Sequence, residues 1–224
     1  MDSRTFIIGD VHGNPNTLEE LLFNICDINC DKDRLIFLGD LIDKGPDSKK
    51  VLDIILNLKN KNTQIIIIRG NHEQNLLDSI NNAKILKQWF RNGGKETLDS
   101  FEVYHPGFID DEYIELIQNS IPYYLTEHFV ITHSGLNFDI SNPLSDTLKM
   151  QTIRNDFVNI DKIGGRRLIV GHTPTSIDNV KISLNKDKIM LDGGCVYYKK
   201  VQGLGYLVAF ELNSMELFSL QNIE

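Results

Sequence analysis

The chain has 224 residues, 41% of them hydrophobic, which is typical of one globular domain with a sizeable core and excludes a disordered protein. Its formal net charge of −8 argues against nucleic acid as a partner, although local positive charge could still attract a phosphorylated substrate. No apolar run could span a bilayer and no signal peptide is recognisable, so we expect a cytoplasmic protein without a membrane partner.

The first part of the chain alternates predicted strands and helices. Runs of large apolar residues predict strands over 6–8, 35–38 and 65–68. Helices are predicted to start at Asn14-Pro15-Asn16 and at Pro46-Asp47-Ser48, because each start precedes apolar residues at helical spacing. This alternation predicts a mainly parallel sheet with right-handed crossovers.

The pattern changes after residue 73. Up to about residue 120 it predicts helices alone, which we interpret as an excursion beside the sheet and not as a second domain. Its basic side chains favour a solvated helix face, with a substrate contact as the alternative; they are Lys84, Lys87, Arg91 and Lys95. Further strands are predicted over 123–132, 168–170, 180–184, 188–191, 203–210 and 217–220.

Five of the apolar runs are followed directly by Asp, Asn or His. They end at Gly9-Asp10-Val11-His12, Gly39-Asp40, Gly70-Asn71-His72, His133 and Gly171-His172. Because α/β sheets bind ligands outside the carboxyl ends of their strands, we expect these side chains at one rim. A single Gly-Asp or His would be an ordinary turn residue, but the recurrence at separate strand ends favours a functional site. His105 and His128 fall outside this pattern.

The pooled side chains suit metal ions. They offer only oxygen and nitrogen atoms, which favours manganese, iron or zinc; the set is Asp10, His12, Asp40, Asn71, His133 and His172. Six ligands are too many for one catalytic metal with an open position, but they match two metals that share a carboxylate. Two such metals about 3.5–4 Å apart can hold the attacking and leaving oxygens of a phosphoryl displacement.

The ordered motifs resemble the phosphoprotein phosphatase family of calcineurin-like metallophosphoesterases, and its bacterial and phage-type serine/threonine phosphatases in particular. The resemblance rests on Gly9-Asp10-Val11-His12-Gly13, Gly39-Asp40-Leu41-Ile42-Asp43-Lys44-Gly45, Gly70-Asn71-His72-Glu73, Asn92-Gly93-Gly94, His133-Ser134-Gly135 and Gly171-His172-Thr173. It implies an α/β fold with a two-sheet β-sandwich core flanked by helices, in a single metallophosphoesterase domain over 1–224. It also implies two divalent metal ions as cofactors, manganese before iron or zinc.

The resemblance implies a role for each site residue. Asp10 and His12 bind the first metal, Asp40 bridges both metals, and Asn71, His133 and His172 bind the second. A hydroxide that bridges the metals attacks phosphorus, and His72, oriented by Asp43, is the general acid. Lys44 and Arg154 bind phosphate. The family usually has Arg where Lys44 stands and Trp where Thr152 stands, which are departures from its pattern.

Three functions remain open at this stage. We prefer a metal-dependent serine/threonine protein phosphatase whose substrate is a phosphorylated protein or peptide. The first alternative is a symmetrical diadenosine tetraphosphate hydrolase; Glu73 favours the phosphatase, because the hydrolase branch often has Asp there. The second alternative is a non-catalytic phosphate-binding protein, against which the complete ligand set argues. The sequence predicts no oligomeric state.

Overall fold

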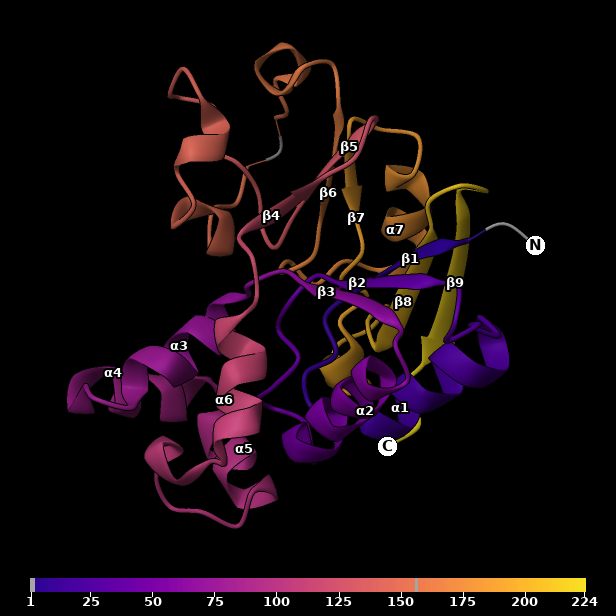
Figure 1. Ribbon diagram of the computed structural model, residues 1–224. Helices are drawn as coiled ribbons and strands as arrows, with labels where there is room; N and C mark the ends of the chain where they lie inside the picture. The colour runs from indigo at the N-terminus through magenta and orange to yellow at the C-terminus, as the bar shows by residue number, and fades with distance from the viewer. Residues whose placement is uncertain (1–2, 156) are drawn as a thin grey trace.

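Two β-sheets form the centre of the protein in the computed structural model, which describes residues 3–155 and 157–224 (Figure 1). The five-stranded sheet has the order β3 (Gln64–Ile67), β2 (Arg34–Phe37), β1 (Thr5–Ile8), β8 (Tyr206–Glu211) and β9 (Glu216–Gln221). The four-stranded sheet has the order β4 (Tyr123–Leu125), β5 (Phe129–Thr132), β6 (Arg167–Val170) and β7 (Lys188–Met190). In each sheet three neighbouring strands are parallel, and the other pairings are antiparallel.

Helices connect and cover the sheets. The α-helices are α1 (Pro15–Glu19), α2 (Ser48–Asn60), α3 (Asn71–Ser79), α4 (Ala83–Trp89), α5 (Lys95–Ser100), α6 (Asp111–Gln118) and α7 (Ile177–Ser183). Single π-helical and 3₁₀ turns are η1 (Glu20–Ile25), η2 (Phe90–Gly94), η3 (Pro106–Phe108), η4 (Pro143–Ser145), η5 (Lys149–Gln151), η6 (Ile160–Ile163) and η7 (Cys195–Tyr197). Helices α3 to α6 gather on the side of the molecule away from β9, as the predicted excursion (Figure 1).

The alternation of side chains along each strand divides the core into layers. In β1, Phe6 and Ile8 pack with the apolar faces of α1 and α2, whereas Ile7 points between the two sheets. There it meets Ile131 and Ile169 of the second sheet. The opposite face of the second sheet is covered by the long segment between β5 and β6. The two-sheet core expected from the family resemblance is therefore present, and the sheets are mixed.

One predicted element is wrong. The strand predicted over 180–184 is part of helix α7, which begins after Ser176. Ser176 accepts a hydrogen bond from the Asn179 backbone N–H, and Val180 and Ser183 are buried one helical turn apart. An N-cap and this spacing favour a helix over the alternation that suggested a strand. Among the helices that the structure describes, none is both long and apolar enough to cross a bilayer.

Candidate metal centre

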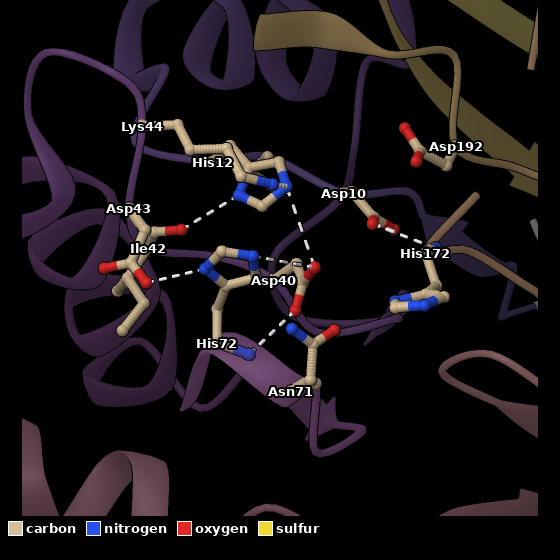
Figure 2. A network of polar contacts seen from close by, with 12 residues as sticks. Asp10, His12, Asp40, Ile42, Asp43, Lys44, Asn71, His72, His172 and Asp192 are labelled. Carbon is tan, nitrogen blue, oxygen red and sulfur yellow. Dashed lines mark hydrogen bonds and ion pairs between the residues drawn. The ribbon is translucent and has the colours of Figure 1, made fainter. Parts of the chain in front are cut away.

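The predicted site residues converge at the carboxyl ends of five strands. Figure 2 shows Asp40 between Asn71 and His72 on one side and His12 on the other. The residues that follow β1, β2, β3, β5 and β6 surround a cavity of about 270 Å³, lined by His12, Asp40, Lys44, Asn71, His72, Asn92, Arg154, His172, Pro174, Asp192 and Tyr197. Asp10, Asp43 and His133 are buried, and each contacts a residue of this lining. The structure thus brings together every residue that the sequence proposed for the site.

The backbone is strained where it aims these side chains. Positive φ angles occur at His12 (47°), Asp40 (48°), Asp43 (75°), Lys44 (66°) and His172 (66°). Such a conformation costs a non-glycine residue about 1–3 kcal/mol, so the surrounding hydrogen bonds must enforce it. The N–H groups of Val11 and His12 both donate to the Asp40 carbonyl, which ties the loops after β1 and β2 together.

Glu73 holds the loop that carries Asp40. Its side chain is fully buried and accepts three backbone hydrogen bonds, from Asp40 (2.8 Å), Leu41 (2.7 Å) and Gly70 (3.1 Å). A methyl group at Gly70 would overlap Asp40 Oδ1 and the Glu73 carboxylate. Glycine at this position therefore lets the loops after β2 and β3 approach each other.

Backbone carbonyls select the tautomers of two predicted ligands. His12 Nδ1 lies 3.0 Å from the Ile42 carbonyl, and His133 Nδ1 lies 2.7 Å from the Leu38 carbonyl. A carbonyl only accepts, so each Nδ1 carries a proton, and in its neutral form each ring presents the lone pair of Nε2 to the site. This orientation is the one that metal-binding histidines need.

The donor set fits two metal ions that share Asp40. Two groups of side chains have ligand atoms within 4.8 Å of one another, His12–Asp40–His72 and Asp40–His133–His172, and Asp40 belongs to both. His133 Nε2 lies 3.3 Å from Asp40 Oδ1 and 3.2 Å from Asn71 Oδ1. Asp10 Oδ1 is buried and has no hydrogen-bond partner among the described residues, as expected of an oxygen that a cation would satisfy. A methyl group at Gly171 would overlap this oxygen, so glycine is required there too.

The electrostatics of the site also favour cations. Burial raises the pKa of Asp10 well above its usual range, and the carboxylates of Asp192 and Asp40 raise it further. Burial also raises the pKa of Asp192, to about 6. Burial opposes the charged form of His133 as well, but the Asp40 carboxylate raises the pKa of that imidazole to about 10. Three desolvated carboxylates at one cavity form a centre that divalent cations would stabilise.

His72 is held by a buried network. Its Nδ1–H donates to Asp43 Oδ2 at 2.6 Å, and the indole N–H of Trp89 donates to the same oxygen at 2.7 Å. The Thr97 hydroxyl donates to Asp43 Oδ1 at 2.6 Å. Burial raises the pKa of Asp43, and these donors oppose that effect. Trp89 and Thr97 therefore help to fix the carboxylate that orients His72.

Replacing Trp89 with Phe should weaken this network. Trp89 is fully buried, and losing a hydrogen bond to a charged group should lower the free energy of unfolding by about 1.5–3 kcal/mol. We expect kcat for an alkyl phosphate to fall by about tenfold while KM stays close to that of the wild type. Urea unfolding followed by circular dichroism and steady-state kinetics measure the two effects. Phe90→Leu is the control, because that half-exposed ring contacts Trp89 and forms no bond to Asp43; a loss of stability with unchanged kcat would leave Trp89 a purely structural role.

The two predicted phosphate-binding residues line the cavity. Arg154 is exposed at its edge, just after the 3₁₀ turn η5. Lys44 Nζ lies 2.9 Å from His12 Nε2, so its ammonium group faces a predicted ligand atom (Figure 2). Both positive charges are thus within the space where a phosphate would bind.

Three residues of the site were missed or misread from the sequence. Glu73 was used only to compare two candidate functions, and neither Trp89 nor Asp192 was proposed for the site. The structure makes Glu73 an acceptor for the Asp40 loop, Trp89 a donor to Asp43, and Asp192 a buried lining residue. The available signal for Asp192 was its position after a strand, in the same pattern as the predicted ligands.

Comparison with known proteins identifies the family. The family model for calcineurin-like phosphoesterases matches residues 3–199. The chain belongs to the calcineurin-like phosphoesterase family. Members of this family hydrolyse phosphoesters at a dinuclear centre of divalent metal ions, and the candidate ligands of such a centre are present here.

Individual members of the family resemble the chain to different extents. An asymmetrical bis(5'-nucleosyl)-tetraphosphatase of Oceanobacillus iheyensis is 28% identical over 222 residues, covering 87% of this chain and 85% of the relative. A symmetrical bis(5'-nucleosyl)-tetraphosphatase of Coxiella burnetii is 42% identical over 73 residues, 33% of this chain and 23% of the relative. Serine/threonine-protein phosphatase 1 of Salmonella typhimurium is 35% identical over 89 residues, 40% of this chain and 38% of the relative. A crystal structure provisionally named a diadenosine tetraphosphatase shares the fold, with a TM-score of 0.66 at 20% identity over 98% of this chain and 93% of the other.

Proposed function

We propose that this calcineurin-like phosphoesterase hydrolyses a phosphoanhydride bond of bis(5'-nucleosyl) tetraphosphates. The observation that carries the proposal is the similarity to the asymmetrical tetraphosphatase, which extends over most of both chains. The match to a protein phosphatase covers 40% of this chain. The sequence motifs favoured the protein phosphatase, but the extent of the longer match supports the tetraphosphatase first.

The site residues have distinct tasks in this reaction. Two divalent cations, when bound, would activate water and polarise the phosphoryl oxygens. The residues that would hold them are Asp10, His12, Asp40, Asn71, His133 and His172. Lys44 and Arg154 would neutralise charge that develops on the phosphoryl oxygens. His72, fixed by Asp43, would donate a proton to the leaving oxygen.

A serine/threonine protein phosphatase is the second candidate, and the His72–Asp43 pair favours it. Asp43 Oδ2 lies 2.6 Å from His72 Nδ1, an arrangement suited to a general acid. The alkoxide of serine or threonine is a poor leaving group that needs a proton. A polyphosphate leaves more easily and needs less assistance, so the tetraphosphatase would depend less on this pair.

A comparison of substrates tests the proposal. Purified enzyme with added manganese should have a kcat/KM for diadenosine tetraphosphate about tenfold or more above that for a phosphoserine peptide, because only the former can occupy more than one phosphate position. Chromatography of the products separates asymmetrical cleavage, which gives AMP and ATP, from symmetrical cleavage, which gives ADP. A preference for the phosphopeptide would replace the proposal by the second candidate.

A further inference from the structure

A second cavity opens beside the metal centre. It has a volume of about 430 Å³ and shares Lys44, Asn92 and Tyr197 with the smaller cavity. Its other lining residues are Arg91, Gly93, Glu96, Val196 and Lys200. One wall is formed by η2 and the other by η7 and the residues that follow it. Cavities of this size accommodate small organic ligands.

The charge of the second cavity is opposite to that of the whole protein, whose net charge is −8. Lys44, Arg91 and Lys200 contribute positive groups to its lining, and Glu96 contributes a carboxylate. Within residues 3–155 and 157–224, neither Arg91 nor Lys200 forms an ion pair. Cationic groups that form no ion pair with these residues leave this cavity able to attract an anion.

Tyr197 stands where the two cavities meet. Its half-buried ring lines both of them, and Lys44 Nζ lies 5.9 Å from the ring centroid. An aromatic face at such a junction can stack against a planar base. The second cavity therefore combines positive charge with an aromatic surface, and it adjoins the cavity that the predicted metal ligands line.

These features distinguish two kinds of substrate. The side chain of phosphoserine carries its charge on the reacting phosphate alone, whereas a nucleoside polyphosphate carries further phosphates and a base beyond it. We propose that the second cavity is the subsite for that distal part, with Arg91 and Lys200 binding the further phosphates and Tyr197 stacking against the base. The proposal rests on the proposed function and deepens it. Among the basic residues first interpreted as a solvated helix face, Arg91 lines this cavity. The proposal therefore adopts, for Arg91, the alternative of a substrate contact.

Calorimetric binding to the manganese-loaded protein tests the subsite. The probes are adenosine 5'-(β,γ-methylene)triphosphate, tripolyphosphate and inorganic phosphate. The double variant Arg91→Ala/Lys200→Ala should bind the first two about tenfold more weakly and bind inorganic phosphate as the wild type does. Tyr197→Ala should weaken the binding of the nucleotide analogue fivefold or more and leave the binding of tripolyphosphate unchanged. This is the result expected for loss of base stacking, which is worth roughly 1–3 kcal/mol. Tyr197→Phe should restore nucleotide binding.

A matched control removes the same charge elsewhere. Lys199 stacks on Tyr198 and Lys87 lies in the last turn of α4, and neither lines the second cavity. Lys87→Ala/Lys199→Ala should bind all three probes like the wild type. Equal losses of affinity in both double variants, or no loss in either, would overturn the subsite. It would also be overturned if Arg91→Ala/Lys200→Ala weakened the binding of a phosphopeptide with acidic flanks and of no other probe. If the predicted losses occur but diadenosine tetraphosphate is not hydrolysed, the subsite stands and the proposed function fails.

Discussion

Replacing His72 with Asn is expected to slow hydrolysis of an alkyl phosphate by about 10²–10⁴-fold, and that of p-nitrophenyl phosphate by less than about tenfold. His72 is 4% exposed at the cavity, and its Nδ1 is bonded to Asp43, so Nε2 remains for the substrate. An alkoxide needs a proton to leave, whereas p-nitrophenolate is stable without one. Values of kcat/KM for a phosphoserine peptide and the aryl phosphate measure the difference.

The metal content of the His72→Asn variant distinguishes two roles for His72, a general acid and a metal ligand. This residue lies close enough to His12 and Asp40 to belong to a group that could hold a metal ion. If His72 is the acid, His72→Asn keeps the metal content of the wild type in mass spectrometric metal analysis. His128→Asn is the control, since that side chain is 75% exposed and does not line the cavity. Loss of a metal ion, or equal rate losses on both substrates, would remove His72 from the acid role.

Asp40→Asn is expected to reduce the affinity for both metal ions by about 100-fold or more, because one carboxylate belongs to both groups of candidate ligands. Asp40 Oδ1 lies 3.3 Å from His133 Nε2, and Oδ2 lies 3.6 Å from His12 Nε2. The amide removes the negative charge that would offset two cations. Activity on every substrate should fall with the metal content. Manganese should raise the Tm of the wild type and leave that of the variant nearly unchanged.

A second Asp→Asn change provides the control for this experiment. Asp47 caps helix α2, where its side chain accepts a hydrogen bond from the Lys50 backbone N–H. Asparagine caps a helix about as well, so Asp47→Asn removes the same charge and should keep metal content, activity and stability. An Asp40→Asn protein that still binds two manganese ions with the affinity of the wild type would show that Asp40 does not bridge them.

Many elements of the fold could be predicted from short patterns. Helix α2 begins after Asp47 and buries Val51, Leu52 and Ile55, as its spacing indicated. The apolar runs that precede Asp10 and Asp40 form strands β1 and β2. The exception over 180–184 arose because a short apolar alternation suits a strand or one face of a helix, and the cap at Ser176 decided between them. The second sheet came only from the family resemblance, because pairing of β5 with β6 joins residues far apart in the chain.

The candidate site, like the fold, could be predicted only in part from the sequence. Local sequence was sufficient to indicate which strand ends carry Asp, Asn and His. It could not indicate that Glu73 accepts hydrogen bonds from Asp40 and Leu41, or that Trp89 donates to Asp43, since these partners lie on different elements.

Local patterns therefore specified the elements and the chemistry available at their ends, because dihedral preference and burial depend on near neighbours. Folding of the whole chain decided which of those ends meet and which ring nitrogen each histidine presents. The physical reason is distance along the chain: the Asp10 carboxylate is bonded by the backbone of His172, 162 residues away, and His133 is oriented by a carbonyl 95 residues away. No periodicity within one segment reports such contacts.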